Sequence, residues 1–179
     1  FCQNWQTSQF RPEDVASRFC PPDNVVELAQ RNGCQSIAYT YTEPVVFYEY
    51  VYDTAVVGRK KGVRSVIISN GYICRDPIIE LCKVLDAVKV DLKAFTEKFY
   101  RETCRGDLKP VLDALKWIKG TGIWLELVIL IVPTLNDSET EIRQMSDWVC
   151  ENLGPHVPMH VSRFHPTYLI KNLPVTPVK

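Results

Sequence analysis

Five apolar segments, each followed by a short polar signature, constrain the fold of this chain more than any other feature. The signatures are Thr42-Glu43-Pro44, Ser69-Asn70-Gly71, Asp91-Leu92-Lys93, Pro133-Thr134 and Phe164-His165-Pro166. The apolar segments are short and rich in Val and Ile, which is typical of strands buried on both faces. Because every signature follows its strand, the pattern predicts one polar face at the carboxyl ends of parallel strands.

Segments with helical periodicity and capping residues alternate with these strands. We expect strands over residues 34–41, 63–69, 87–92, 123–132 and 159–164. We expect helices over residues 11–19, 23–31, 44–61, 76–85, 107–119 and 138–152, and a helical turn near 96–104. Such alternation requires parallel pairing through crossover connections. An open doubly wound sheet and a barrel both fit it. One more strand ahead of residue 1 would make six and favours a partial (β/α)6 TIM-like barrel, an α/β fold whose first strand is missing.

Size and charge exclude several classes of protein. The 179 residues, of which 46% are hydrophobic, suffice for one sizeable core, so we expect one domain. The 21 basic and 21 acidic side chains balance, so no overall charge directs the chain to nucleic acid. No apolar run reaches the roughly 18 residues of a membrane span, and no export signal is recognised at the start. We therefore expect a cytoplasmic protein without a nucleic-acid or membrane partner.

The seven cysteines are odd in number, irregularly spaced and free of any Cys-x-x-Cys pair. We expect most of them to be free thiols in a reducing cytosol and several to serve as small core residues. A structural zinc site would need two closely spaced pairs. Cys2 shares the core reading but has a second one, because Phe1-Cys2-Gln3-Asn4-Trp5 matches the end of a Cys-xxx-Cys-x-aromatic-Cys loop. The first two cysteines of that loop would lie upstream of residue 1.

Glu43 has two readings. In the first it is part of a helix cap, with Thr42 as the N-cap and Pro44 in the first turn. In the second, its carboxylate at the carboxyl end of a strand accepts a hydrogen bond from a ligand ammonium. The sequence leaves both open.

Asp91 and Lys93 belong on one face of their strand and Leu92 on the other, because side chains alternate along a strand. Two opposite charges at a barrel mouth are costly to desolvate unless they pair or bind something. They can form a structural ion pair, bind a ligand, or provide Lys93 as a Schiff-base nucleophile.

The remaining signatures are less specific. Ser69-Asn70-Gly71 can be only a turn, with Gly71 supplying a positive φ, or can present a hydroxyl and an amide to a ligand. His165 ends the last strand before Pro166, whereas His160 lies within that strand and is expected to be structural. His156 lies in a Gly-Pro loop, where we expect exposure to solvent.

Taken in this order, the signatures resemble the radical S-adenosylmethionine (SAM) superfamily. The nearest branch is that of pyruvate formate-lyase-activating enzyme, and within it the AmmeMemoRadiSam system radical SAM enzymes. The segments that carry the resemblance are Phe1-Cys2-Gln3-Asn4-Trp5, Tyr41-Thr42-Glu43-Pro44, Ser69-Asn70-Gly71, Val90-Asp91-Leu92-Lys93, residues 132–137 and Arg163-Phe164-His165-Pro166. It covers essentially the whole chain. It implies a radical SAM core domain over residues 1–179, truncated at the N-terminus and at the C-terminus.

The resemblance also implies roles for individual residues. Cys2 corresponds to the third cysteine ligand of a [4Fe-4S] cluster, and Phe1 to the aromatic residue near adenine. Thr42 and Glu43 take the place of a Gly-Gly-Glu that contacts the SAM amino group, and only the glutamate matches. Val132 corresponds to the position against which adenine packs. The positions that hold the methionine and ribose parts of SAM correspond to Ser69, Asn70, Asp91, Lys93 and His165.

The expected activity is reductive cleavage of SAM to a 5′-deoxyadenosyl radical, which abstracts hydrogen from an unknown substrate. That substrate is a small molecule or a peptide loop, as in glycyl-radical activation, and the electron donor is a protein such as flavodoxin or ferredoxin. Since two cluster cysteines are missing, we expect this chain alone to bind a cluster poorly and to be inactive. The alternatives are a Schiff-base lyase built on Lys93 and a non-catalytic truncated barrel that acts as a binding protein.

Overall fold

A five-stranded parallel sheet forms the centre of the computed structural model, which describes residues 2, 4–16 and 18–178. Its strands are β1 (Ser36–Tyr39), β2 (Arg64–Ser69), β3 (Ala87–Asp91), β4 (Trp124–Ile131) and β5 (Met159–Arg163). All neighbours pair in parallel and the order across the sheet is the order along the chain. A doubly wound sheet would reverse its order at a switch point. The sequential order therefore confirms the prediction of a partial TIM-like barrel.

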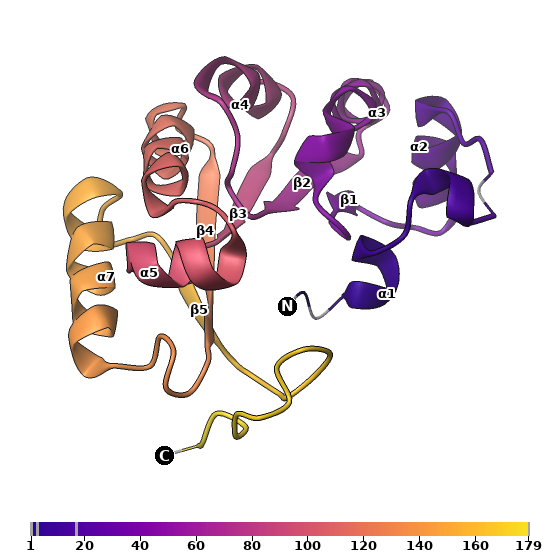
Figure 1. The fold of residues 1–179 in the computed structure, drawn as a ribbon. Helices are drawn as coiled ribbons and strands as arrows, with labels where there is room; N and C mark the ends of the chain where they lie inside the picture. Colours follow the sequence, from indigo (N-terminus) through magenta and orange to yellow (C-terminus); the bar gives the residue numbers. More distant parts are fainter. Residues whose placement is uncertain (1, 3, 17, 179) are drawn as a thin grey trace.

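The helices that connect the strands cover one side of the sheet. They are α3 (Tyr48–Lys60), α4 (Arg75–Cys82), α6 (Leu108–Gly120) and α7 (Glu139–Asn152), while α2 (Pro22–Arg31) precedes β1. Figure 1 shows α3, α4, α6 and α7 in an arc along the outer side, with α1 (Trp5–Ser8) and the tail after β5 toward the inner side. The shorter elements are η1 (Pro12–Asp14), η2 (Pro44–Phe47), α5 (Glu97–Phe99) and the π-helical turn η3 (Tyr100–Cys104).

The core lies between the sheet and this outer layer of helices. In β4, every second side chain from Leu125 to Ile131 is buried, whereas Glu126, Val128 and Leu130 are only partly buried. The alternation follows from the pleat, which sends successive side chains to opposite faces. We call the side turned away from the helices the inner face. Its partial exposure leaves room for ligands.

Two expectations about local structure are wrong. The helix expected over residues 11–19 is only the short turn η1, because its apolar side chains find no core: Val15 and Phe19 are exposed, Phe19 by 93%. The cysteines do not supply several core residues, since Cys82 alone is buried, although all seven are free thiols as expected. No helix among the described residues combines the length and apolarity needed to cross a membrane.

Candidate functional site

Glu43 joins the end of β1 to the carboxyl end of β2. Its Oε1 accepts hydrogen bonds from the Ser69 hydroxyl at 2.7 Å and the Val45 N–H at 3.3 Å. Its Oε2 accepts from the Asn70 N–H at 2.8 Å. Glu43 is thus itself the N-cap of η2, and the expectation that Thr42 fills this role is wrong. Thr42 is exposed, and the longer side chain of the next residue reaches the free N–H.

The Glu43 carboxylate keeps capacity for a ligand. An ionised carboxylate has about four lone-pair directions, and three are used here. Oε2, with one partner, can accept a further hydrogen bond from an ammonium group without releasing the Asn70 N–H. The capping role and the ligand-binding role are therefore compatible in one side chain.

The turn after β2 is fixed by its own side chains. Ser69 Oγ accepts from the Gly71 N–H at 3.1 Å, and Asn70 Oδ1 accepts from the Tyr72 N–H at 2.8 Å. Gly71 has φ +72°, and a Cβ there would lie 2.8 Å from Val90 Cγ1. The turn therefore needs glycine for two reasons, and it leaves the Asn70 amide NH2 group available to a ligand.

Asp91 and Lys93 form an ion pair at the carboxyl end of β3. The distance from Lys93 Nζ to Asp91 Oδ2 is 3.0 Å, and the two side chains are 42% and 36% exposed. Leu92 is fully buried on the other face, so the predicted alternation is confirmed. An ion pair this accessible contributes only about 0–1 kcal/mol to folding. Stability alone is a weak explanation for placing both charges at this edge.

The backbone of Lys93 is held by two side chains from other elements. Its N–H donates to the Tyr100 hydroxyl at 3.2 Å, and its C=O accepts from Asn136 Nδ2 at 2.7 Å. Asn136 is buried, and it also donates to the Leu130 C=O at 2.9 Å and accepts from the Val132 N–H at 2.6 Å. Burial raises the pKa of Tyr100, so its hydroxyl stays neutral. Asn136 thus locks the end of β3 to the end of β4.

The last two candidates lie at the ends of β4 and β5. Val132 follows β4 and is 4% exposed, and His165 follows β5 and is exposed. The tail beyond His165 is anchored by Thr176, whose hydroxyl donates to the Ile131 C=O at 2.6 Å and accepts from the Phe164 N–H at 2.8 Å. These bonds hold the tail beside the polar edge of the sheet.

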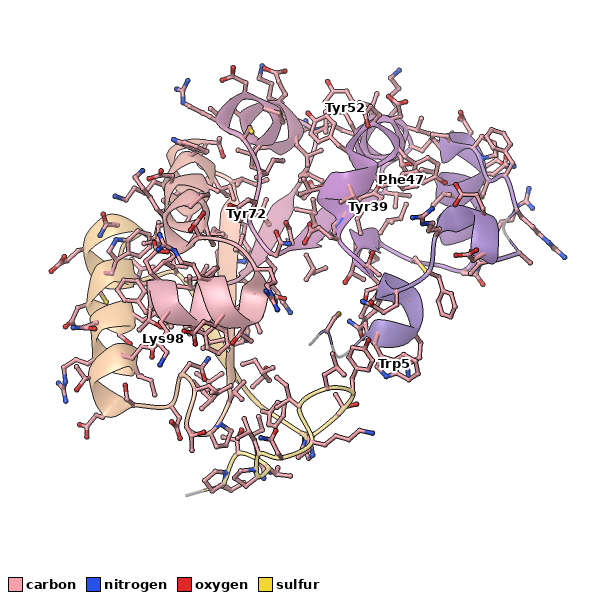
Figure 2. The ribbon with its side chains drawn as sticks, viewed as in Figure 1. Trp5, Tyr39, Phe47, Tyr52, Tyr72 and Lys98 are labelled. Atoms are coloured by element: carbon pink, nitrogen blue, oxygen red, sulfur yellow. The ribbon has the colours of Figure 1, made fainter. Side chains whose placement is uncertain are left out.

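The tail also contacts the N-terminal region. The rings of Tyr168 and Trp5 stack with their centroids 5.3 Å apart, and Figure 2 shows Trp5 on α1 beside the tail. Cys2, three residues before Trp5, is an exposed free thiol. Phe1 lies outside the described residues. The stack therefore joins the segment next to Cys2 to the segment that follows His165.

Comparisons with known proteins agree with this geometry. The model of the radical SAM superfamily matches residues 1–145. The chain belongs to this superfamily. An uncharacterized protein of Methanocaldococcus jannaschii is 43% identical over 178 residues, which are 99% of this chain and 53% of that protein. The radical SAM chain is also 26% identical over 110 residues to pyruvate formate-lyase 1-activating enzyme of Escherichia coli K12, which covers 59% of this chain and 44% of that enzyme.

Solved structures share the fold. SuiB of Streptococcus suis, in its complex with S-adenosylmethionine, superposes with a TM-score of 0.69 at 13% identity, over 90% of this chain and 38% of that chain. The predicted superfamily and its pyruvate formate-lyase-activating branch are thereby confirmed. The chain spans about half the length of the curated relatives it matches.

The radical SAM superfamily implies an iron–sulfur cluster, and the described residues supply only part of one. Such clusters are held by several cysteine thiolates. Among residues 2, 4–16 and 18–178, no group of three or more His, Cys, Asp or Glu side chains is close enough to hold a metal. Cys2 alone does not fit a cluster, and binding through it requires further thiolates. The polar edge with Glu43 and Lys93, in contrast, fits the amino and carboxylate groups of SAM.

Sequence reasoning missed two residues of this candidate site. Tyr100 lies within the helical turn expected near residues 96–104, and the sequence Asn136-Asp137-Ser138 predicts the cap of the following helix. Ser138 of this segment is the N-cap, because its hydroxyl accepts from the Glu141 N–H at 3.2 Å. The only signal for Asn136 was a polar residue directly after a buried strand, which the cap reading explained equally well.

Proposed function

We propose that this chain is the core of a longer radical SAM enzyme that binds SAM at the carboxyl edge of its sheet. Cys2 and two further cysteines would hold a [4Fe-4S] cluster, which would supply an electron for the cleavage of SAM. The resulting 5′-deoxyadenosyl radical would take hydrogen from a substrate. The observation that carries the proposal is the convergence of Glu43 and the Asp91–Lys93 pair at one edge. The chain's membership of the superfamily supports it.

Each polar group at this edge has a proposed partner on SAM. Glu43 accepts from the ammonium through Oε2, which has one protein partner. Lys93 donates to the carboxylate or a ribose hydroxyl, and Asp91 accepts from a ribose hydroxyl while it orients the ammonium of Lys93. The remaining SAM contacts are assigned to Ser69, Asn70, Val132, His165 and Phe1.

The substrate is proposed to be a small molecule or a peptide loop. A solved structure of SuiB bound to the precursor peptide SuiA shares the fold with a TM-score of 0.64. The Escherichia coli relative is an activating enzyme of pyruvate formate-lyase. Both support a peptide or protein as the substrate. The electron donor is proposed to be a cytoplasmic protein such as flavodoxin or ferredoxin.

The alternative of a Schiff-base lyase is less consistent with the site. A lysine nucleophile is activated by an apolar pocket or a neighbouring cation. Lys93 instead pairs with a carboxylate and is 42% exposed. The third alternative, a non-catalytic binding barrel, would share the SAM contacts and differs only in turnover.

Equilibrium binding of SAM to the intact protein, meaning the natural polypeptide that contains this chain, tests the proposed contacts. Glu43→Gln replaces a charge-assisted hydrogen bond with a neutral one, so SAM affinity should fall about tenfold or more. Lys93→Met should give a similar loss. Lys119→Met, on the exposed end of α6, is the matched control and should bind like the wild type. Unchanged affinity in both site variants would overturn the assignment.

A further inference from the structure

A second group of polar side chains lies on the inner face of the sheet, apart from the proposed SAM contacts. Glu126 on β4 accepts from Trp124 Nε1 at 2.8 Å, and its other oxygen lies 2.8 Å from His160 Nε2 on β5. Lys89 on β3 is the register partner of Glu126. Three adjacent strands (Figure 1) therefore contribute one residue each to a cluster of Lys89, Glu126 and His160.

This cluster is nearer the amino ends of the strands than the SAM contacts are. Lys89 precedes Asp91 by two residues on the same strand face, which corresponds to about 6.6 Å along β3. Glu126 lies five residues before Ile131, the last residue of β4. Between cluster and edge, the same face of β4 carries the apolar Val128 and Leu130. A mostly apolar surface with a few converging polar groups is typical of a small-molecule site.

The ammonium of Lys89 lies near Glu126 without a hydrogen bond to it. The hydrogen bonds from Trp124 and His160, with a smaller contribution from the charge of Lys89, hold the pKa of Glu126 below its usual range, so Glu126 is ionised, and each of its oxygens has one hydrogen-bond partner. Among the contacts of the described residues, Lys89 has neither an ion pair nor a side-chain hydrogen bond. The group available to a ligand is therefore an ammonium with three N–H donors.

The ring of His160 is oriented by Glu126. A carboxylate can only accept, so Nε2 of His160 donates to Glu126 and the tautomer is fixed. Nδ1 then remains for a ligand, and it becomes a donor when the ring is protonated. The expected structural role of His160 agrees with its cross-strand bond to Glu126, and its side chain is also 52% exposed and therefore accessible to a ligand. Cross-strand pairs this accessible add little to the stability of a sheet.

We propose that Lys89 and His160 form an oxyanion-binding subsite on the inner face, and that the substrate presents a carboxylate or phosphate group there. Lys89 supplies the charge, and His160 supplies a second contact in its protonated form. Glu126 is a positioning residue, since it acts through His160. A ligand amine is disfavoured at the Lys89 ammonium, because like charges repel each other. The identity of the ligand as substrate rests on the proposed function, whereas the subsite itself does not.

The test follows the ring signals of His160 by NMR during titration with an oxyanion. Comparison with His160→Gln assigns the His160 signals, because these are the ring signals that the variant lacks. Inorganic phosphate and acetate are titrated separately into the intact protein, in the absence of the [4Fe-4S] cluster and of SAM. We expect a saturable shift of the His160 signals with at least one of them. A response to phosphate alone or to acetate alone identifies the preferred group.

Two matched variants show whether Lys89 is responsible. Lys89→Met removes the ammonium while keeping a long side chain, and should weaken the anion about tenfold or more. Lys89→Arg should retain binding, and Lys119→Met, an exposed lysine on α6, should titrate like the wild type. A circular dichroism melt checks that Lys89→Met is folded, and Lys89→Gln, which also removes the charge, carries the test if it is not.

No saturable His160 shift with either anion would overturn the proposal, as would equal affinity in folded Lys89→Met and the wild type. Neither result depends on SAM or on a cluster. Failure of the subsite is therefore distinguishable from failure of the proposed function, which is judged by SAM binding and cleavage.

Discussion

Lys93 takes its position from side chains that do not touch the proposed ligand. Tyr100 binds its N–H and Asn136 binds its C=O, so the residue after the end of β3 keeps its backbone bonds although the strand ladder has ended. A buried backbone group without a partner costs about 1–3 kcal/mol, so each bond matters. The ammonium, in turn, is oriented by Asp91.

Removing the Asn136 amide should destabilise the fold. Asn136→Ala leaves the Lys93 C=O, the Leu130 C=O and the Val132 N–H without this partner. We expect the free energy of unfolding in urea to fall by about 2–4 kcal/mol. Asn152→Ala, which removes one exposed bond to the Trp148 C=O, is the control and should cost about 0.5 kcal/mol or less. Equal losses in the two variants would contradict the proposed lock.

Some of this residue-scale geometry could be predicted and some could not. The ion pair of Asp91 and Lys93 followed from strand alternation, which is local. The bonds of Lys93 to Tyr100 and Asn136 join positions 7 and 43 residues apart. They depend on how α5, η3 and the loop after β4 pack, which no local pattern encodes.

At the scale of elements, the turn after β2 connects strand geometry to the site. In this turn, the Asn70 N–H and the Ser69 hydroxyl both donate to Glu43, and the Ser69 hydroxyl oxygen accepts from the Gly71 N–H. Gly71 packs directly against Val90 of β3. The turn therefore fixes β1, β2 and β3 relative to one another at the polar edge.

Adding a methyl group at Gly71 should disrupt this arrangement. Gly71→Ala introduces strain at φ +72° and a Cβ only 2.8 Å from Val90 Cγ1. Gly33→Ala is a matched control, because Gly33 has φ +68° but no atom within 4 Å of its Cβ position. We expect the control to lose about 1 kcal/mol of unfolding free energy and Gly71→Ala about 1–3 kcal/mol more. Thermal or urea melts that give the same loss in both would contradict this account.

The strands were predicted from the sequence to within two residues at each end, and α6 and α7 to within one. β4 was expected over residues 123–132 and spans Trp124–Ile131. Its apolar and β-branched side chains are typical of a strand that packs on both faces. The region 11–19 failed for the opposite reason. It has apolar residues such as Phe19, but their packing partners are not set by periodicity, and the chain there is largely irregular.

At the scale of the whole molecule, sequential winding brings every polar signature to one edge. The order β1 to β5 places the connecting helices along the outer side of the sheet, while α1 and the tail after β5 lie toward the inner side. The proposed SAM contacts and the proposed oxyanion subsite belong to strands of this one sheet and are separated along the strand direction. This arrangement would place a substrate anchored at Lys89 beneath SAM.

Cluster binding is a property that the chain should not have by itself. One thiolate, Cys2, gives a weak site, so anaerobic reconstitution of the 179-residue chain should yield far less than one [4Fe-4S] per chain by iron and sulfide analysis. The intact protein should bind one cluster and lose it in Cys2→Ala. A stoichiometric cluster in the 179-residue chain would show that this ligand assignment is wrong.

Release of 5′-deoxyadenosine from SAM by the reconstituted, dithionite-reduced intact protein tests the central claim most directly. The account predicts release by the wild type, none by Cys2→Ala, and wild-type release by Cys34→Ala, which removes another exposed thiol. It also predicts reduced release by Lys93→Met. No 5′-deoxyadenosine above the Cys2→Ala level, from protein with a full cluster and bound SAM, would contradict the account.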